Sequence, residues 1–221
     1  MTRDLNSGLE SGSDAVPMGC PPHGRQALIA TILLACASSF PLAAADVPPE
    51  SWPAAMSLDA RESATPAASL FVEQHGLDQH VSGLQLGAGN IGLIEQQGSA
   101  SSAHLQQAGA SQRASVWQDG MANRALVQQA GTNNNAEVEQ RGSGNEAEID
   151  QWGSDGFAEI RQVGDNNLAS IAQRGDGLTG QIHQIGSNNV YHLFSSGPES
   201  AQISVIQVGD SAPPVLITPG N

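Results

Sequence analysis

The side chains with the most regular spacing in this sequence are glutamines, which recur every eleven residues from Gln85 to Gln184. A primary amide carries two N–H donors and a carbonyl acceptor, so its chemistry is hydrogen bonding. Amides that stack at the spacing of β-strands hydrogen-bond to one another along the stack. We predict such an amide ladder from Gln96, Gln107, Gln118, Gln129, Gln140, Gln151, Gln162, Gln173 and Gln184, with Asn123, Asn134, Asn145, Asn167 and Asn189 as further members.

Groups with catalytic or metal-binding potential lack a supporting arrangement. Glu137 and Glu139 could be a pair of catalytic carboxylates, but alternation along a strand places both on a solvated outer face. Ser195 follows His192 closely, yet no acid or oxyanion loop accompanies them. The histidines do not fall at close ligand spacing. We therefore expect no enzyme activity, no metal, no cofactor and no small-molecule substrate.

Three other positions keep the same period as the glutamines. A glycine follows two residues after each glutamine, an alanine commonly stands at the seventh position, and an aliphatic residue stands at the ninth. A fixed period of this kind indicates a repeat architecture. The predicted turn glycines are Gly98, Gly109, Gly120, Gly131, Gly142, Gly153, Gly164, Gly175 and Gly186. The predicted core aliphatic residues are Ile94, Leu105, Val116, Val127, Val138, Ile149, Ile160, Ile171, Ile182 and Leu193.

The elements that must position these residues are short strands. Ala136, Val138 and Gln140 alternate with Glu137 and Glu139, which predicts a strand with its small, aliphatic and amide side chains inward. Glycine and asparagine between such segments favour tight turns. We predict an all-β fold, a β-solenoid of 11-residue strand-turn half-repeats with two strands per 22-residue rung, stacked as cross-β structure able to form amyloid. An 11-residue helical supercoil is the alternative, and the recurrent glycines disfavour it.

Composition limits the partners. The formal net charge is −14, lysine is absent, and only 4% of residues are aromatic. Binding to nucleic acid relies on Lys and Arg near phosphates, so we expect no nucleic acid partner. A core of large side chains is not available, but stacked repeats can build a thin core from small ones.

Four segments are predicted along the chain. Residues 1–45 are a preamble and signal peptide, with cleavage after Ala45 and translation starting at Met1 or Met18. Lipoprotein processing at Cys36 is the rival interpretation. Residues 46–80 are a flexible leader, in which 67–80 form a short helix or a loose first strand. Residues 81–209 are the solenoid, and 210–221 are a tail in which Pro213 and Pro214 end strand pairing.

The repeat Gln-x-Gly-x-x-Asn-x-Ala-x-(Ile/Val)-x-Gln resembles the curlin repeat of bacterial curli fibres. The resemblance covers residues 82–209. The uniform half-repeats, with Ala at the seventh position and an aliphatic residue at the ninth, resemble the minor, nucleator-type curlin more than the major subunit. The acidic-to-neutral, proline-terminated C-terminal stretch departs from the basic final repeat of the familiar nucleator.

The resemblance implies a secreted subunit of an extracellular functional amyloid at the surface of a Gram-negative bacterium, with roles in fibre nucleation, adhesion and biofilm matrix. Its implied partners are further copies of the chain, a major curlin subunit, and the curli secretion and assembly proteins at the outer membrane. Two alternatives stay open: a major or accessory curlin subunit, and a non-polymerising secreted β-solenoid that serves as an adhesin module.

Overall fold

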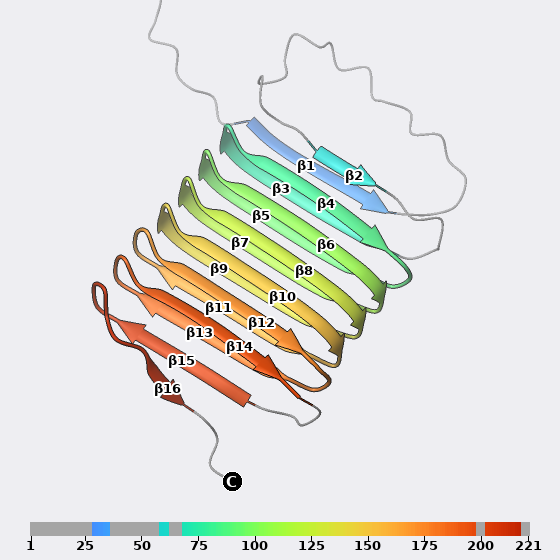
Figure 1. The fold of residues 1–221 in the computed structure, drawn as a ribbon. Coiled ribbons are helices and arrows are strands. Elements are labelled where there is room, and N and C mark those ends of the chain that lie inside the picture. Colours follow the sequence, from blue (N-terminus) through green and yellow to red (C-terminus); the bar gives the residue numbers. More distant parts are fainter. Residues whose placement is uncertain (1–27, 36–57, 62–67, 198–201, 218–221) are drawn as a thin grey trace, which may run out of the picture.

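A computed structural model describes residues 28–35, 58–61, 68–197 and 202–217 (Figure 1). These residues form strands and the turns between them, so the predicted all-β solenoid is confirmed and the helical alternative is wrong. The part of the chain described here contains no helix that is long and apolar enough to cross a membrane. The predicted cleavage after Ala45, and the alternatives at Met18 and Cys36, fall outside the described residues.

The strands belong to two sheets, and consecutive solenoid strands alternate between them. Sheet A has nine strands, in the spatial order β1 (Leu28–Ala35), β3 (Ser69–Leu77), β5 (Ile91–Ser99), β7 (Arg113–Met121), β9 (Asn135–Ser143), β11 (Phe157–Val163), β13 (Thr179–Ile185), β15 (Gln202–Val208) and β16 (Val215–Ile217). Sheet B has seven, in the order β2 (Leu58–Arg61), β4 (His80–Leu86), β6 (Ser102–Ala110), β8 (Arg124–Thr132), β10 (Glu146–Ser154), β12 (Leu168–Arg174) and β14 (Val190–Ser196).

The stacking is parallel and in register from β3 to β14. Residues 22 apart are paired, as Gln129 is with Gln151 and Gln140 is with Gln162. The strands from β5 to β10 are nine residues long, so they extend beyond the five or so positions that alternation alone predicts, and two residues remain for each turn between them. Two half-repeats thus make one rung, and each rung lies directly on the next (Figure 1).

The stack begins earlier than the predicted boundary at Val81. Strand β3 lies in the segment predicted to be a leader, and it pairs in parallel with β5 over its full length. Leu70, Val72 and Gln74 point inward, as the corresponding residues of later repeats do. The run Leu70-Phe71-Val72 lacks the alanine of the repeat, and that lack made a helix or a loose strand equally compatible with this sequence.

The C-terminal end differs from the prediction in one respect. The last repeat is one residue longer, and Gln207 pairs with Gln184 because the segment between β14 and β15 contains the extra residue. The prediction that Pro213 and Pro214 end strand pairing is wrong, since β16 follows them and pairs antiparallel with β15. The two prolines lie in the connection that reverses the chain direction, where no ladder hydrogen bond is required of them.

The core between the sheets is built from small and aliphatic side chains. All ten predicted aliphatic residues are buried. In nine of them the inward residue two positions earlier is an alanine or a glycine, and before Leu193 it is Tyr191. Where a leucine occupies the core, the facing position is smaller: a Cβ on Gly92 would lie 2.5 Å from Leu105 Cδ2, and one on Gly180 would lie 2.9 Å from Leu193 Cδ2. In a close-packed core, a leucine at one position therefore requires a glycine at the position that faces it.

Candidate assembly site: the internal amide ladders and the edges of the stack

The glutamines form two internal columns, one behind each sheet. In sheet A, Gln74 is the first member and Gln207 the last, and each Nε2 donates to the Oε1 of the glutamine in the next rung at 2.7–2.9 Å. In sheet B the column runs from Gln85 to Gln173 with distances of 2.6–2.9 Å. The structure places the nine glutamines predicted for the ladder in these two columns, all buried.

Most of these amides use a second contact that the sequence did not indicate. Gln140 Nε2 donates to the Arg124 backbone carbonyl at 3.0 Å, and Gln162 Nε2 donates to that of Glu146 at 3.0 Å. The acceptor lies at the start of the neighbouring strand in the opposite sheet, sixteen residues earlier. The same amide therefore links one rung to the next and one sheet to the other. Each hydrogen bond of such a buried amide stabilises the folded state by about 1 kcal/mol, and leaving the amide unpaired would destabilise the folded state by more than that.

The asparagines stabilise the turns. Asn145 Nδ2 donates to Asn123 Oδ1 at 3.2 Å and to the Gly164 carbonyl at 2.8 Å, and Asn167 repeats the pattern with Asn145 and Gly186. Asn189 continues the column, because its backbone N–H donates to Asn167 Oδ1. The predicted ladder members Asn123, Asn145, Asn167 and Asn189 thus lie in one column.

Asn134 belongs to the turns at the other end of the strands. Its column contains Gly156 in the next rung, so no amide pair forms there; Asn134 Oδ1 accepts the Gly156 N–H instead, and its Nδ2 donates to the Gly153 carbonyl. Gln112 takes the same position one rung earlier and donates to the Gly131 carbonyl. Gln112 was not among the predicted ladder residues, although its eleven-residue offset from Asn123 would have indicated it.

The predicted turn glycines lie at the corner where each strand ends, just before the turn. Their φ angles are between +112° and +144°. Glycine is required at these positions for a steric reason as well as for its φ angle: a Cβ on Gly142 would lie 2.1 Å from the carbonyl oxygen of Gly164 in the next rung. The turn itself adopts the left-handed conformation two residues later, at Ala100 with φ 57° and at Asn133 with φ 55°. The closest neighbours at that position are side chains or more distant atoms and not a backbone oxygen, and alanine, serine, asparagine and aspartate all occur there with positive φ.

The outer face of sheet A is charged. Glu139 forms ion pairs with Arg161 at 3.4 Å and with Arg141 at 3.3 Å, and the Arg141 guanidinium lies 4.5 Å from the centre of the Trp117 ring. Glu137 is exposed and pairs in register with Glu159. Exposed ion pairs stabilise by about 0–1 kcal/mol, so this network does not determine the fold. Among the described residues, no group of three or more His, Cys, Asp or Glu is arranged to hold a metal ion.

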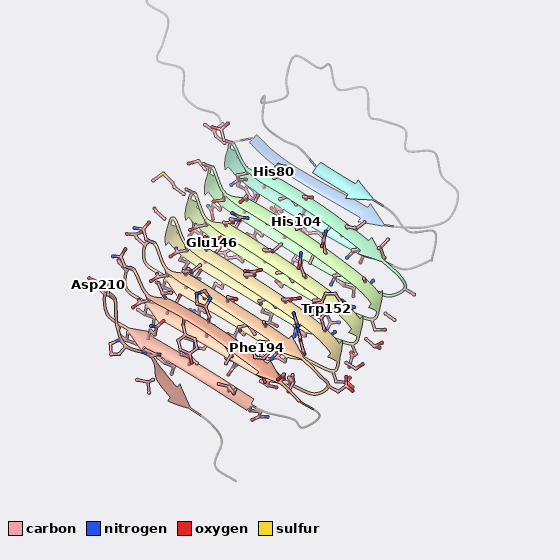
Figure 2. The ribbon with its side chains drawn as sticks, in the orientation of Figure 1. His80, His104, Glu146, Trp152, Phe194 and Asp210 are labelled. Carbon is pink, nitrogen blue, oxygen red and sulfur yellow. The ribbon has the colours of Figure 1, made fainter. Side chains whose placement is uncertain are left out.

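One histidine on sheet B has a perturbed titration. Partial burial, together with the nearby His80, lowers the pKa of His104 below its ordinary value. Both residues lie on the outer face of the first two full strands of sheet B (Figure 2). Desolvation and a second cationic group both disfavour the charged imidazolium.

The ends of the stack present strand edges with different coverage. At the first rung, β1 pairs antiparallel with β3, and the short β2 pairs in parallel with four residues of β4. At the last rung, β16 pairs antiparallel with three residues of β15, and Gln207 Nε2 donates to the Ala212 carbonyl at 2.7 Å. Strand β14 is the terminal strand of sheet B. Strand β1 lies within the predicted signal peptide, whose removal would leave the edge of β3 unpaired.

The fold and these ladders define a class: a two-sheet parallel β-solenoid with a period of 22 residues, stabilised by buried amide columns. A family model described as the curlin associated repeat matches residues 131–164 and 164–190, which lie within the solenoid. No curated protein matches the chain. The repeat match supports the curlin family and a curli-type structural subunit.

Proposed function

We propose that this chain is a secreted subunit of a curli-type functional amyloid fibre, exported from a Gram-negative bacterium and assembled at its surface for adhesion and biofilm matrix. One observation carries the proposal: the glutamine columns run through the stack from rung to rung, from Gln74 to Gln207 and from Gln85 to Gln173. A further chain with the same period could continue each column. The curlin repeat match to residues 131–190 supports the same conclusion.

The subunit type that we propose is the nucleator. A folded solenoid offers a complete set of strand N–H and C=O groups at its edge, and such edges recruit further strands. Once the segment that contains β1 is removed, β3 would present its nine residues and the Gln74 amide as a template. The partners of this role are further copies of the chain, a major curlin subunit, and the secretion and assembly proteins of the outer membrane.

A thioflavin-T time course tests the proposal. The chain from Asp46 to Asn221 is diluted from denaturant, alone and as a seed for a major curlin subunit. We expect rapid assembly that also shortens the lag of the major subunit. The full chain, which keeps residues 1–45, is the matched control, and it should seed more slowly because β1 covers β3. Assembly without seeding would instead indicate a major or accessory subunit.

The alternative function is a solenoid that does not polymerise and acts as an adhesin module. The pairing of β16 with β15 favours it, because solenoids that stay monomeric carry covered ends. The same time course separates the two functions. A soluble monomer with β-type circular dichroism, and with no thioflavin-T signal after prolonged incubation, would overturn the amyloid proposal.

A further inference from the structure

The two outer faces of the solenoid differ in charge. Sheet A carries Glu137, Glu139, Arg141, Glu159 and Arg161 on its outer surface. On β4, β6 and β8 of sheet B, the outer positions on either side of the inward glutamine hold only uncharged side chains: Leu84, Gln106 and Gln128 in one column, and Leu86, Ala108 and Ala130 in the other. The next strand, β10, contributes Asp150 and Trp152 to these two columns, so they contain one carboxylate from Leu84 to Trp152. In a chain with a net charge of −14, a surface with so little charge is a place where two copies can approach without strong repulsion.

This part of sheet B is also hollowed. A groove is lined by these two columns and is closed at one end by Trp152 on β10. The register aligns Leu86, Ala108, Ala130 and Trp152 in consecutive rungs. The two alanines are the floor of the groove, and the large side chains at its ends remain exposed, Leu86 by 45% and Trp152 by 54%.

The walls of the groove are held in place by hydrogen bonds. Gln128 Nε2 donates to Gln106 Oε1 at 3.2 Å on the outer surface, parallel to the internal ladder. The Trp152 indole Nε1–H donates to the Asp150 carboxylate, which fixes the orientation of the ring. Figure 2 shows Trp152 near the carboxyl end of β10, on the same sheet as His104 and Phe194. A protruding ring and a hollow that could receive a ring therefore lie in one column.

We propose that this face of sheet B, from Leu84 to Trp152, is a self-complementary interface through which two copies of the chain pair laterally, face to face. A two-fold axis that passes between the two copies at Ala130 and runs along the strand direction would relate the rung of Trp152 to the rung of Ala108. Each Trp152 ring then fills the hollow over Ala108 of the other copy. Such an interface is isologous, since the same patch is used on both sides.

The occupant is a second copy because the patch supplies both halves of the contact. Two sheets that pack face to face lie about 10 Å apart, which suits short side chains in the centre and one aromatic anchor on each side. Paired sheets with interdigitated uncharged side chains are the usual dry contact between stacked β-sheets. The inference is independent of end-to-end assembly, because the face is present on a single solenoid as well as on a stack of them.

The test measures mass per length of fibres formed by the full chain, by scanning transmission electron microscopy. We expect a value twice that of a single stack. Ala130→Glu, which puts one buried carboxylate from each copy on the axis, should halve it, and so should Trp152→Ala. Trp152→Phe should retain the doubled value. Val163→Glu is the matched control: it occupies the same repeat position on sheet A, next to Arg141, and should leave the value doubled.

A register-specific measurement accompanies the first. In a chain with Cys20→Ser and Cys36→Ser, Ala130→Cys places two thiols on the axis, across a separation of about 10 Å between the sheets. That separation is too long for a disulfide, so a short bis-maleimide should cross-link the two copies, whereas Val163→Cys should not be cross-linked. Single-stack mass in the unsubstituted chain, or equal cross-linking of both variants, would overturn the proposal. If the chain stays soluble, analytical ultracentrifugation replaces microscopy: a dimer abolished by Ala130→Glu supports the interface, and a monomer at all concentrations overturns it.

Discussion

At the scale of single residues, the buried glutamines carry the most stringent requirement. Gln140 is fully buried; its Oε1 accepts from Gln118, and its Nε2 donates to Gln162 and to the Arg124 carbonyl. Gln140→Glu replaces both donated hydrogens with a carboxylate that faces two carbonyl oxygens. We expect slower assembly and a folded state less stable by more than about 1–3 kcal/mol, because a buried charge costs more than a neutral unpaired group. Thioflavin-T kinetics and urea unfolding measure the two effects.

The control for that substitution is Gln97→Glu, which makes the same chemical change on the exposed face of the strand that carries Gln96. It should change stability by less than about 0.5 kcal/mol, as surface substitutions usually do. Equal effects of the two substitutions would mean that total charge, and not the amide column, determines assembly.

His104 predicts a pH dependence. Its pKa is lowered in the folded state by burial and by His80, so below pH 6.5, the ordinary histidine pKa, the unfolded chain binds the proton more readily than the folded chain. The contribution of His104 is therefore present above that pH and is lost as the pH falls through it. Urea midpoints measured from pH 8 to pH 5 should decline, and less steeply in His104→Gln. Parallel curves for the two proteins would remove His104 as the cause.

At the scale of the element, the glycine at the end of each strand and the residue two positions later have different tolerances. Gly142→Ala would place a methyl group 2.1 Å from the Gly164 carbonyl oxygen at φ +112°. Gly89→Ala is the matched control: its φ is +69°, near the φ of 57° at Ala100 in the same turn position, and its nearest neighbouring atom is 3.5 Å away.

We expect Gly142→Ala to destabilise the solenoid by clearly more than 1 kcal/mol and Gly89→Ala to be close to neutral, because only the first forbids the close approach of two rungs. Urea unfolding monitored by circular dichroism measures both variants. If both substitutions cost the same, positive φ alone would explain the glycines, and the carbonyl contact would be irrelevant.

The strands could be predicted from the sequence, but the conformation of the turns could not. The period of Gln140 and its equivalents, with alternation around it, was sufficient for the strands, their inward faces and the pairing of residues 22 apart. Ala100 and Ala122 carry the left-handed turn without a residue type that signals it. The strand at Leu70–Gln74 lacks the alanine of the repeat, and the contacts from glutamine amides to the opposite sheet depend on the distance between sheets. Gln74 and Gly76 do keep the eleven-residue period, so extending the register by one half-repeat would have predicted that strand, whereas the contacts between the sheets leave no trace in the sequence.

At the scale of the whole molecule, the two ends of the stack are unequal. Strand β16 covers three residues of β15, and the Ala212 N–H donates to Asn189 Oδ1 while its carbonyl accepts from Gln207. These contacts use groups that an added rung would need. The end that begins with β3 loses its antiparallel neighbour β1 if residues 1–45 are removed, and then only β2 remains on sheet B.

This asymmetry predicts growth from one end. Deleting residues 212–221 removes β16 together with both Ala212 contacts, whereas deleting residues 215–221 removes β16 alone. The longer deletion should raise the rate of seeded elongation about twofold, because the second end then accepts chains as the first does. The shorter deletion should raise it less, because the Ala212 contacts remain. Fluorescently labelled subunits are added to seeds of the chain from Asp46 that carries Ala130→Glu, because the two stacks of a laterally paired fibre run in opposite directions and would show growth at both ends. In these single stacks we expect growth at one end when the C-terminus is intact and at both ends after the longer deletion. Growth at both ends of the single-stack seeds with the intact C-terminus would mean that β16 is displaced at no cost and does not restrict assembly.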